Sequence, residues 1–336
     1  QFRFATGLML GIAYSASIGG LATPIGSPPN AILIGYLSDS FGYEISFFTW
    51  MTIALPLTAL FLPIAWLLLT HVIYRPGFDH IPSGRAHIRE SLRELGPLSR
   101  GELTVMSVFT LTVLAWLSRG FVANIDGPVG GFVGRRIDDS TVAMAAAIAL
   151  FVIPVDLRTR SFTLDWETAK GLPWGVLILF GGGLSIAGAV KSSGLDAFIG
   201  ASVSALGSAP TLLVVAVSTA LVVLLTEMTS NTATATIFVS ILTGVALGLG
   251  VDPLLFIVPA ALAASCSFMM PVATPPNAIV YGSGRVSIRQ MVRAGACMHI
   301  FSIALILLIT YTVATEILNI DHAGVPDWAH TESSTL

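Results

Sequence analysis

The stretch Gly26-Ser27-Pro28-Pro29-Asn30-Ala31-Ile32 decides the fold of this chain, because it recurs as Ala273-Thr274-Pro275-Pro276-Asn277-Ala278-Ile279. Each copy lies inside an apolar run long enough to cross a bilayer. A Pro-Pro pair lacks two backbone N–H donors and disfavours helix at the preceding residue, so a spanning helix must stop there and begin again. Ser27 and Thr274 are good N-cap residues followed by proline, which predicts helix starts at Pro28 and Pro275.

Each break would leave the last carbonyls of one half-helix facing the first free amides of the next. Such an arrangement suits a cation on one side and an anion on the other. Two broken helices in one chain are typical of secondary transporters. The alternative, that the prolines only kink packed helices, accounts poorly for two copies with matching flanks.

The composition is that of a membrane protein. With 336 residues, of which 54% are hydrophobic and 10% charged, and a mean hydropathy of +0.84, the chain cannot be a water-soluble globule, in which about a quarter of the residues are charged. We expect an all-α polytopic protein of a plasma or bacterial inner membrane. The net charge of -3 carries no information about nucleic-acid partners, and none is expected. Cys266 and Cys297 lie in apolar stretches, which predicts core packing and no disulfide.

Apolar runs of about twenty residues predict the membrane segments. They are a broken helix at 6–36, spans at 46–74, 103–120, 141–156 and 173–190, a lipophilic or amphipathic piece at 194–207, a hairpin at 210–249, a second broken helix at 253–283 and a last span at 292–317. In the hairpin, two apolar arms of about fourteen residues flank a polar centre at 226–234. Arms of that length predict a re-entrant hairpin with its tip at mid-membrane rather than two full spans.

The basic residues predict the orientation. Twelve of the sixteen Lys and Arg residues share one face if Arg3, the 75–101 linker and the loops at 157–170 and 284–293 are cytoplasmic. The positive-inside rule supports this topology, in which the two broken helices cross in opposite directions, so that the repeats are inverted. The acidic tail 319–336 is then external.

The linker is expected to be a solvated amphipathic connector, with a lipid-headgroup or regulatory site as the alternative. Because the chain begins at Gln1 directly before a span, we expect it to be the C-terminal part of a longer protein.

Polar residues inside the membrane segments are the candidates for function, because each costs free energy unless a partner or ligand satisfies it. No Lys or Arg lies in a span core, so an anion must be held by neutral donors, which are Ser27, Asn30, Ser230, Asn231, Thr232, Thr274 and Asn277. Oxygens for a desolvated Na⁺ come from the same places, namely Thr226, Thr229, Asn231 and unwound carbonyls around Gly26 and Ala273. The alternative for the Ser/Thr-rich turn is hydrogen bonding between helices.

Glu227 is the one carboxylate clearly inside the predicted membrane core. Two interpretations stay open for it: a proton or cation site, or an acceptor for neighbouring backbone amides. His299 is expected to be a packed or interfacial histidine. Gly7 and Gly11 are expected to permit close helix contact.

The motif Ser230-Asn231-Thr232 resembles the second Ser-Asn-Thr signature of the divalent anion:sodium symporter family, whose members carry succinate, malate, citrate or sulfate. The stretch 270–279 is similar to the second unwound helix of that family, and 18–30 to the first. The resemblance implies a transport domain at 1–74 and 208–318 that moves like an elevator against a dimeric scaffold at 102–207. The chain is therefore expected to form a homodimer in the lipid bilayer.

The resemblance also implies roles for individual residues. The second sodium site corresponds to Thr226, Thr229, Asn231 and Ala273, and part of the first sodium site to Gly26. The substrate contacts correspond to Ser230, Asn231, Thr232, Thr274 and Pro275, with Ser27 and Pro28 facing them. The first hairpin and first Ser-Asn-Thr motif of the family are absent from this sequence, so we expect that this chain alone does not transport.

The sequence therefore predicts the C-terminal portion of a Na⁺-coupled symporter for a divalent anion, such as the C4-dicarboxylates succinate or malate. An anion exchanger or H⁺-coupled carrier of the same fold, and a sulfate carrier, stay open. Broken inverted repeats argue against a channel. An intramembrane enzyme is disfavoured, because the sequence shows no paired acids, metal-ligand histidine cluster or nucleophile with a base.

Overall fold

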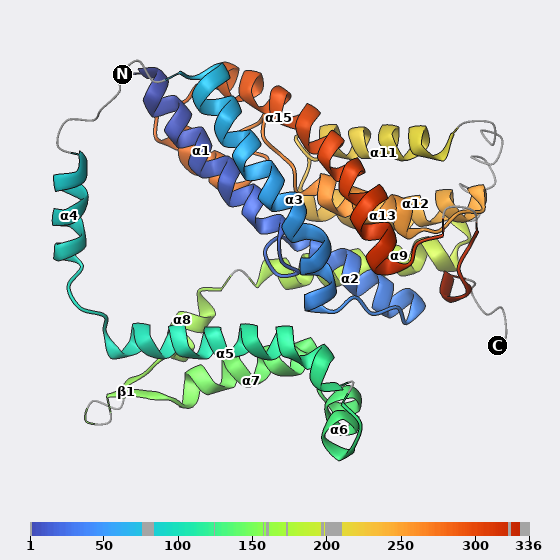
Figure 1. Ribbon diagram of the computed structural model, residues 1–336, viewed down its shortest axis with the longest axis horizontal. Coiled ribbons are helices and arrows are strands. Elements are labelled where there is room, and N and C mark those ends of the chain that lie inside the picture. Colours follow the sequence, from blue (N-terminus) through green and yellow to red (C-terminus); the bar gives the residue numbers. More distant parts are fainter. Residues whose placement is uncertain are drawn as a thin grey trace. The chain divides into compact units, whose positions relative to one another are not determined.

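The computed structural model describes residues 2–75, 84–123, 125–156, 158, 161–172, 174–195, 198, 210–321 and 324–329. Residue contacts divide the chain into two compact units. The first comprises Gln1–Ile45, Thr49–Gly77 and Gly175–Leu336, and the second comprises Ser46–Phe48 and Phe78–Trp174. Both units are built mainly from helices (Figure 1).

The first unit contains both predicted breaks. Its helices are α1 (Phe2–Leu21), α2 (Pro28–Phe41), most of α3 (Phe47–Leu67), α9 (Gly175–Ser192), α11 (Thr211–Leu225), α12 (Asn231–Leu249), α13 (Leu254–Ala264), α14 (Pro275–Gly282), α15 (Ile288–Ile309) and α16 (Thr315–Leu318). A π-helical stretch, Leu68–Ile73, extends α3, a second one, Thr310–Ala314, joins α15 to α16, and a 3-10 turn spans Asp327–Ala329. The predicted piece at 194–207 lies mostly outside the described residues.

Helices in the described part of the chain are long and apolar enough to cross a membrane. Five segments meet this condition, namely Arg3–Leu21, Phe47–Ile73, Arg100–Ala123, Asn231–Leu249 and Ile288–Leu318. They confirm the prediction of an integral membrane protein.

Both helix breaks fall where the Pro-Pro pairs predict them. The first lies between the end of α1 at Leu21 and the start of α2 at Pro28. The second lies between the end of α13 at Ala264 and the start of α14 at Pro275. The prolines occupy the first turn of each new helix, so their missing N–H groups cost no intrahelical hydrogen bond.

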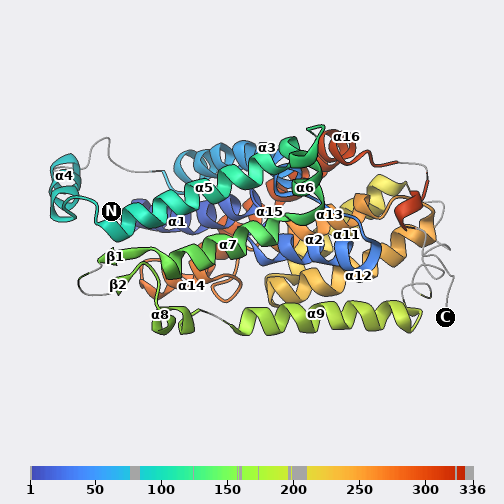
Figure 2. The same cartoon turned by 90° about the horizontal axis from the view of Figure 1, so that it is seen from below.

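The half-helices of the two repeats pack crosswise. α1 packs against α14, and α2 packs against α13, so the first half of each repeat contacts the second half of the other (Figure 2). Every residue of α13 is buried. A helix that is apolar on all sides belongs in the interior, and α13 forms the centre of this unit.

The predicted hairpin consists of α11 and α12, joined at 226–230. α12 packs against both α13 and α2, and this brings the hairpin to both breaks. The predicted length of the second arm is wrong, because α12 begins at Asn231 and has 19 residues, enough to cross a membrane. The polar run after Ser230 forms the first helical turn, in which the Thr234 amide donates to the Ser230 carbonyl at 2.9 Å.

The second unit contains α4 (Gly84–Glu94), α5 (Arg100–Ala123), α6 (Pro128–Arg136), α7 (Asp139–Val152), α8 (Trp166–Lys170) and an antiparallel pair of strands, β1 (Pro154–Asp156) and β2 (Ser161–Phe162). The strands correct the expectation of an all-α chain. They also shorten the predicted span at 141–156, because Pro154 cannot continue α7. α5 packs against α6 and α7, and the Arg119 guanidinium lies 2.9 Å from the Asp139 carboxylate.

Candidate functional site

The turn after α11 and the unwound residues after α13 meet at a group of oxygen atoms. Thr226 ends α11 and Asn231 begins α12, and the Thr226 hydroxyl donates to Asn231 Oδ1 at 2.7 Å. From the other side, Ser267 Oγ donates to Asn231 Oδ1 at 2.9 Å, and the Ala264 carbonyl oxygen lies 2.8 Å from Thr226 Oγ1. We call Thr226 Oγ1, Asn231 Oδ1, Ser267 Oγ and the Ala264 carbonyl oxygen the oxygen cluster.

The oxygen cluster carries no formal charge and has few protons to share. Thr226 has one hydroxyl proton but faces two acceptors, Asn231 Oδ1 and the Ala264 carbonyl. The described residues contain no group of three His, Cys, Asp or Glu side chains that could hold a metal ion. Neutral oxygens at this spacing are suited to a weakly held monovalent cation.

The structure brings together two of the four residues predicted for the second sodium site. Thr226 and Asn231 contact each other in the oxygen cluster. The Thr229 hydroxyl instead bonds a carbonyl and a threonine hydroxyl within its own hairpin. The Ala273 amide closes a backbone turn with Met270 at 3.3 Å.

Two members of the oxygen cluster were missed by the sequence prediction, namely Ser267 and the Ala264 carbonyl. The available signal was the polar pair Ser265 and Ser267, directly after an apolar helix. Such residues inside a membrane segment require a partner.

Three helix N-termini adjoin the residues that follow α13. Ser27 Oγ lies 2.7 Å from Ser265 Oγ, so the start of α2 contacts these residues. The bond from Ser267 to Asn231 joins the start of α12 to them, and α14 follows in the chain at Pro275. Because a helix N-terminus offers free amides and partial positive charge, this arrangement suits an anion.

The two predicted N-caps differ. Thr274 Oγ1 accepts a hydrogen bond from the Asn277 amide at 3.4 Å, as predicted. Ser27 also occupies the predicted N-cap position, but its side chain makes no capping bond, and its hydroxyl pairs with that of Ser265. The remaining predicted residues lie at the same helix starts, with Gly26, Pro28, Ser230 and Pro275 exposed and Thr232 buried.

The Asn30 and Asn277 side chains, predicted as donors for an anion, are engaged by the backbone. Both are fully buried. Asn30 Nδ2 donates to three carbonyls of the first break, those of Gly20, Leu21 and Thr23, at 3.2, 3.3 and 2.9 Å. Asn277 Nδ2 donates to two carbonyls of the second break, those of Ser267 and Met270, at 3.2 and 3.1 Å. Each amide therefore closes the break that precedes it.

The buried Glu227 carboxylate contacts four donors. The amides of Phe268 and Met269 donate to Oε1 at 2.5 and 2.8 Å, and the Met270 amide donates to Oε2 at 2.8 Å. His299 Nε2 lies 2.8 Å from Oε1. These contacts support the interpretation of Glu227 as an acceptor for amides, which come from a segment more than forty residues away in the chain.

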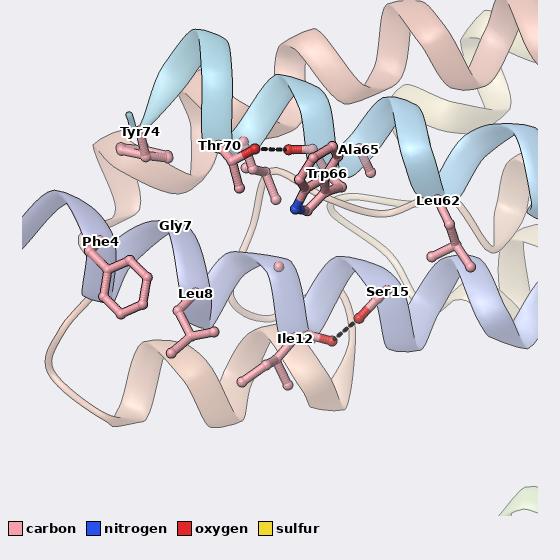
Figure 3. Close-up of a pocket in the computed structure, with 12 residues that line it drawn as sticks. Phe4, Gly7, Leu8, Ile12, Ser15, Leu62, Ala65, Trp66, Thr70 and Tyr74 are labelled. Carbon is pink, nitrogen blue, oxygen red and sulfur yellow. Dashed lines mark hydrogen bonds between the residues drawn. The ribbon is translucent and has the colours of Figure 1, made fainter. Parts of the chain in front are cut away.

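A pocket of about 520 Å³ lies between α1 and the end of α3 (Figure 3). Its lining is mostly apolar and includes no charged residue. The hydroxyls of Ser15 and Thr70 in this lining bond to carbonyls of their own helices. Gly7 allows Tyr74 to approach closely there, which confirms the close helix contact predicted for it. This pocket suits an apolar group rather than an anion.

Comparison with known proteins agrees with this geometry. Residues 1–318 match the family model described as the sodium:sulfate symporter transmembrane region. The sodium-dependent dicarboxylate transporters SdcS of Staphylococcus aureus strains USA300 and N315 are each 42% identical to this chain over 320 residues. The alignment covers 95% of this chain and 61% of each relative, so the chain spans about three fifths of the length of these relatives. The chain belongs to the sodium:sulfate symporter family, the divalent anion:sodium symporters that its motifs resemble.

Proposed function

We propose that this chain is part of a secondary transporter that moves a divalent anion, a C4-dicarboxylate such as succinate or malate, together with Na⁺. One observation carries the proposal: the oxygen cluster and three helix N-termini meet at the residues that follow α13. The oxygens suit a cation and the free amides suit an anion, and adjacent binding couples the two. The relatives named sodium-dependent dicarboxylate transporters support both ligands.

In this proposal the oxygen cluster binds one Na⁺. Its ligands are Thr226 Oγ1, Asn231 Oδ1, Ser267 Oγ and the Ala264 carbonyl oxygen. A cation there would be coordinated by lone pairs of these four neutral oxygens. The family resemblance adds Thr229 and Ala273 to this site, and it adds Gly26 to a further sodium site at the first break.

The dicarboxylate is held without a basic side chain. The sequence has no Lys or Arg between Arg3 and Arg75 or between Lys191 and Arg285, and these intervals contain both breaks and the hairpin. The proposed contacts are Ser27, Pro28, Ser230, Asn231, Thr232, Thr274 and Pro275. Each helix N-terminus contributes about half a positive charge, so co-bound Na⁺ is needed to neutralise a divalent anion.

The proposed architecture is an elevator-type homodimer with inverted repeats. The crosswise packing of α1 on α14 and α2 on α13 supports the inversion, because oppositely directed repeats place unlike halves together. By resemblance, 1–74 and 208–318 form the transport domain and 102–207 the scaffold. The 75–101 segment is the cytoplasmic linker, and 319–336 is the external tail.

Uptake of radiolabelled succinate into proteoliposomes that contain the full-length protein tests the proposal. Succinate should accumulate under an inward Na⁺ gradient and not under a K⁺ gradient. Malate and fumarate should compete with it, and neutral succinamide should not.

Three other results would replace the proposal. Uptake that requires internal dicarboxylate would indicate an exchanger, and uptake that follows a pH gradient without Na⁺ would indicate an H⁺-coupled carrier. Uptake inhibited by sulfate, with dicarboxylates inert, would indicate a sulfate carrier.

A further inference from the structure

The segment 267–270 belongs to neither α13 nor α14, so its backbone groups need partners from elsewhere. In the interior of a membrane protein, water is a poor source of such partners. Its carbonyls at Ser267 and Met270 accept from Asn277, and its Phe268 carbonyl accepts from the Tyr14 hydroxyl at 2.8 Å. Its amides at 268, 269 and 270 all donate to Glu227. Side chains from three other parts of the chain therefore hold this segment.

The Glu227 carboxylate is engaged by four groups, three of them at Oε1 and one at Oε2. An ionised carboxylate offers about four acceptor positions. Two backbone amides and the His299 imidazole meet at Oε1, and the Met270 amide donates to Oε2. Glu227 is also 4% exposed, so solvent does not compete for these positions. Glu227 directly follows Thr226 of the oxygen cluster, but its carboxylate contacts the amides of the unwound segment and His299.

α15 is shaped to approach the unwound segment closely. Gly295 and His299 are one helical turn apart and lie on the same face of α15. A β-carbon on Gly295 would lie 2.6 Å from the carbonyl carbon and oxygen of Phe268, so a larger residue would push the segment away. This approach brings His299 within hydrogen-bonding distance of Glu227.

We propose that Glu227, oriented by His299, is a positioning residue that fixes the segment 267–270 and thereby sets the Na⁺ affinity of the oxygen cluster. Ser267 links the two, because its hydroxyl belongs to the cluster and its neighbour Phe268 is the first residue that Glu227 holds. Release of the segment would move Ser267 Oγ away from Asn231. This inference rests on the proposed function, which assigns Na⁺ to the cluster.

Glu227→Gln tests the inference at nearly constant side-chain shape. One carboxylate oxygen becomes an NH₂ group, which faces a backbone amide that now donates to that oxygen. In proteoliposomes with the full-length protein, the Na⁺ concentration for half-maximal succinate uptake should rise about tenfold, with the succinate KM at saturating Na⁺ changed by less than about twofold. Glu316→Gln makes the same chemical change at an exposed position of α16 and should leave both values unchanged.

Hydrogen exchange of a peptide that covers 265–271, measured without Na⁺, reports on the contact itself. The amides of the segment should exchange faster in Glu227→Gln than in the wild type. This result does not depend on transport, so it stands even if the protein fails to carry dicarboxylates.

Three outcomes would overturn the inference. A raised Na⁺ requirement with unchanged exchange would make Glu227 a direct ion ligand. Faster exchange with an unchanged Na⁺ requirement would separate the segment from the ion site, and no change in either would remove the role altogether. If Glu227→Gln does not fold, His299→Phe is the second test, because it removes the imidazole donor and keeps the carboxylate. It should raise the Na⁺ concentration for half-maximal uptake and speed the hydrogen exchange of 265–271.

Discussion

The two helix breaks have nearly the same sequence, but different groups hold them. In both, an asparagine in the first turn of the new helix donates to carbonyls of the unwound residues. At the first break, α3 adds two donors to carbonyls: the Trp50 indole to Leu21 at 3.1 Å and the Thr58 hydroxyl to Ile18 at 3.4 Å. At the second break, the Tyr14 hydroxyl donates to the Phe268 carbonyl, and the Glu227 carboxylate also accepts from three amides.

This difference shows that the repeated motif determines where a helix breaks, whereas the neighbouring helices determine which backbone groups stay available. The donors from α3 use carbonyls of the first break. At the second break, the Ala264 carbonyl oxygen and the Ser267 hydroxyl contact Thr226 and Asn231 of the hairpin. The second break can therefore supply oxygens to a cation site within this chain.

The largest effect is expected from Asn231→Ala, because Asn231 Oδ1 accepts from both Thr226 and Ser267 in the oxygen cluster. Its loss removes an oxygen for Na⁺ and an N–H₂ group for a carboxylate. Na⁺-dependent succinate uptake by the full-length protein should fall at least about tenfold while membrane expression is retained. Thr243→Val is the control, since that buried hydroxyl bonds only the backbone of its own helix. Uptake above half of the wild-type rate would contradict the assignment.

A smaller and paired effect is expected from Asn30→Ala and Asn277→Ala. Each substitution leaves buried carbonyls without a donor, which should lower the free energy of unfolding by about 2 kcal/mol. Thermal denaturation in detergent measures the stability loss of each variant. Similar losses of unfolding free energy would show that the same kind of contact, an asparagine amide that donates to carbonyls, closes both breaks. A loss confined to one variant would show that the other break is held by its remaining contacts, Trp50 at the first or Glu227 at the second.

Exchange at one of the two positions that differ between the repeated motifs should sharpen the comparison. Gly26 stands where the second repeat has Ala273, yet a β-carbon on Gly26 would lie 2.5 Å from the Gly20 carbonyl oxygen. Gly26→Ala should therefore destabilise the protein by about 1–3 kcal/mol. Ala273→Gly should cost less than about 1 kcal/mol, and Gly19→Ala, which meets no neighbour, is the control. Equal losses of stability in Gly26→Ala and Ala273→Gly would mean that the two breaks are packed equally tightly.

The smallest effect concerns the residue that precedes the second broken helix. Burial raises the pKa of the Asp252 carboxyl to about 6, and the nearby Asp321 carboxylate adds to the rise. Because the folded pKa exceeds the ordinary value of 3.8, the stability that protonation contributes is lost as the pH rises through 6. The melting temperature should be higher at about pH 5 than at about pH 7.5, and Asp252→Asn should reduce this difference. The first broken helix has no acid in its first turn, so a pH dependence unchanged by Asp252→Asn would have to come from other groups.

The sequence alone determined where the second half of each broken helix starts. Pro28 and Pro275 act on their own backbone and on the residue before them, so the breaks need no partner from elsewhere in the chain. Long apolar runs likewise determined that the chain crosses a membrane. The underestimated length of α12 was also local, because residues 231–234 were assigned to the polar centre of the hairpin, whereas a helix N-terminus favours such residues as well.

Only the tertiary structure decided which partners these residues find. Ser267 is 36 positions from Asn231, and His299 is 72 positions from Glu227. Ser27 has the chemistry of a cap, but the packing of α2 on α13 offers it a hydroxyl 238 residues away. The chemistry of each side chain sets which bonds it can form, and the packing of helices far apart in the chain sets which of those bonds exist, because no local pattern contains the position of a distant helix.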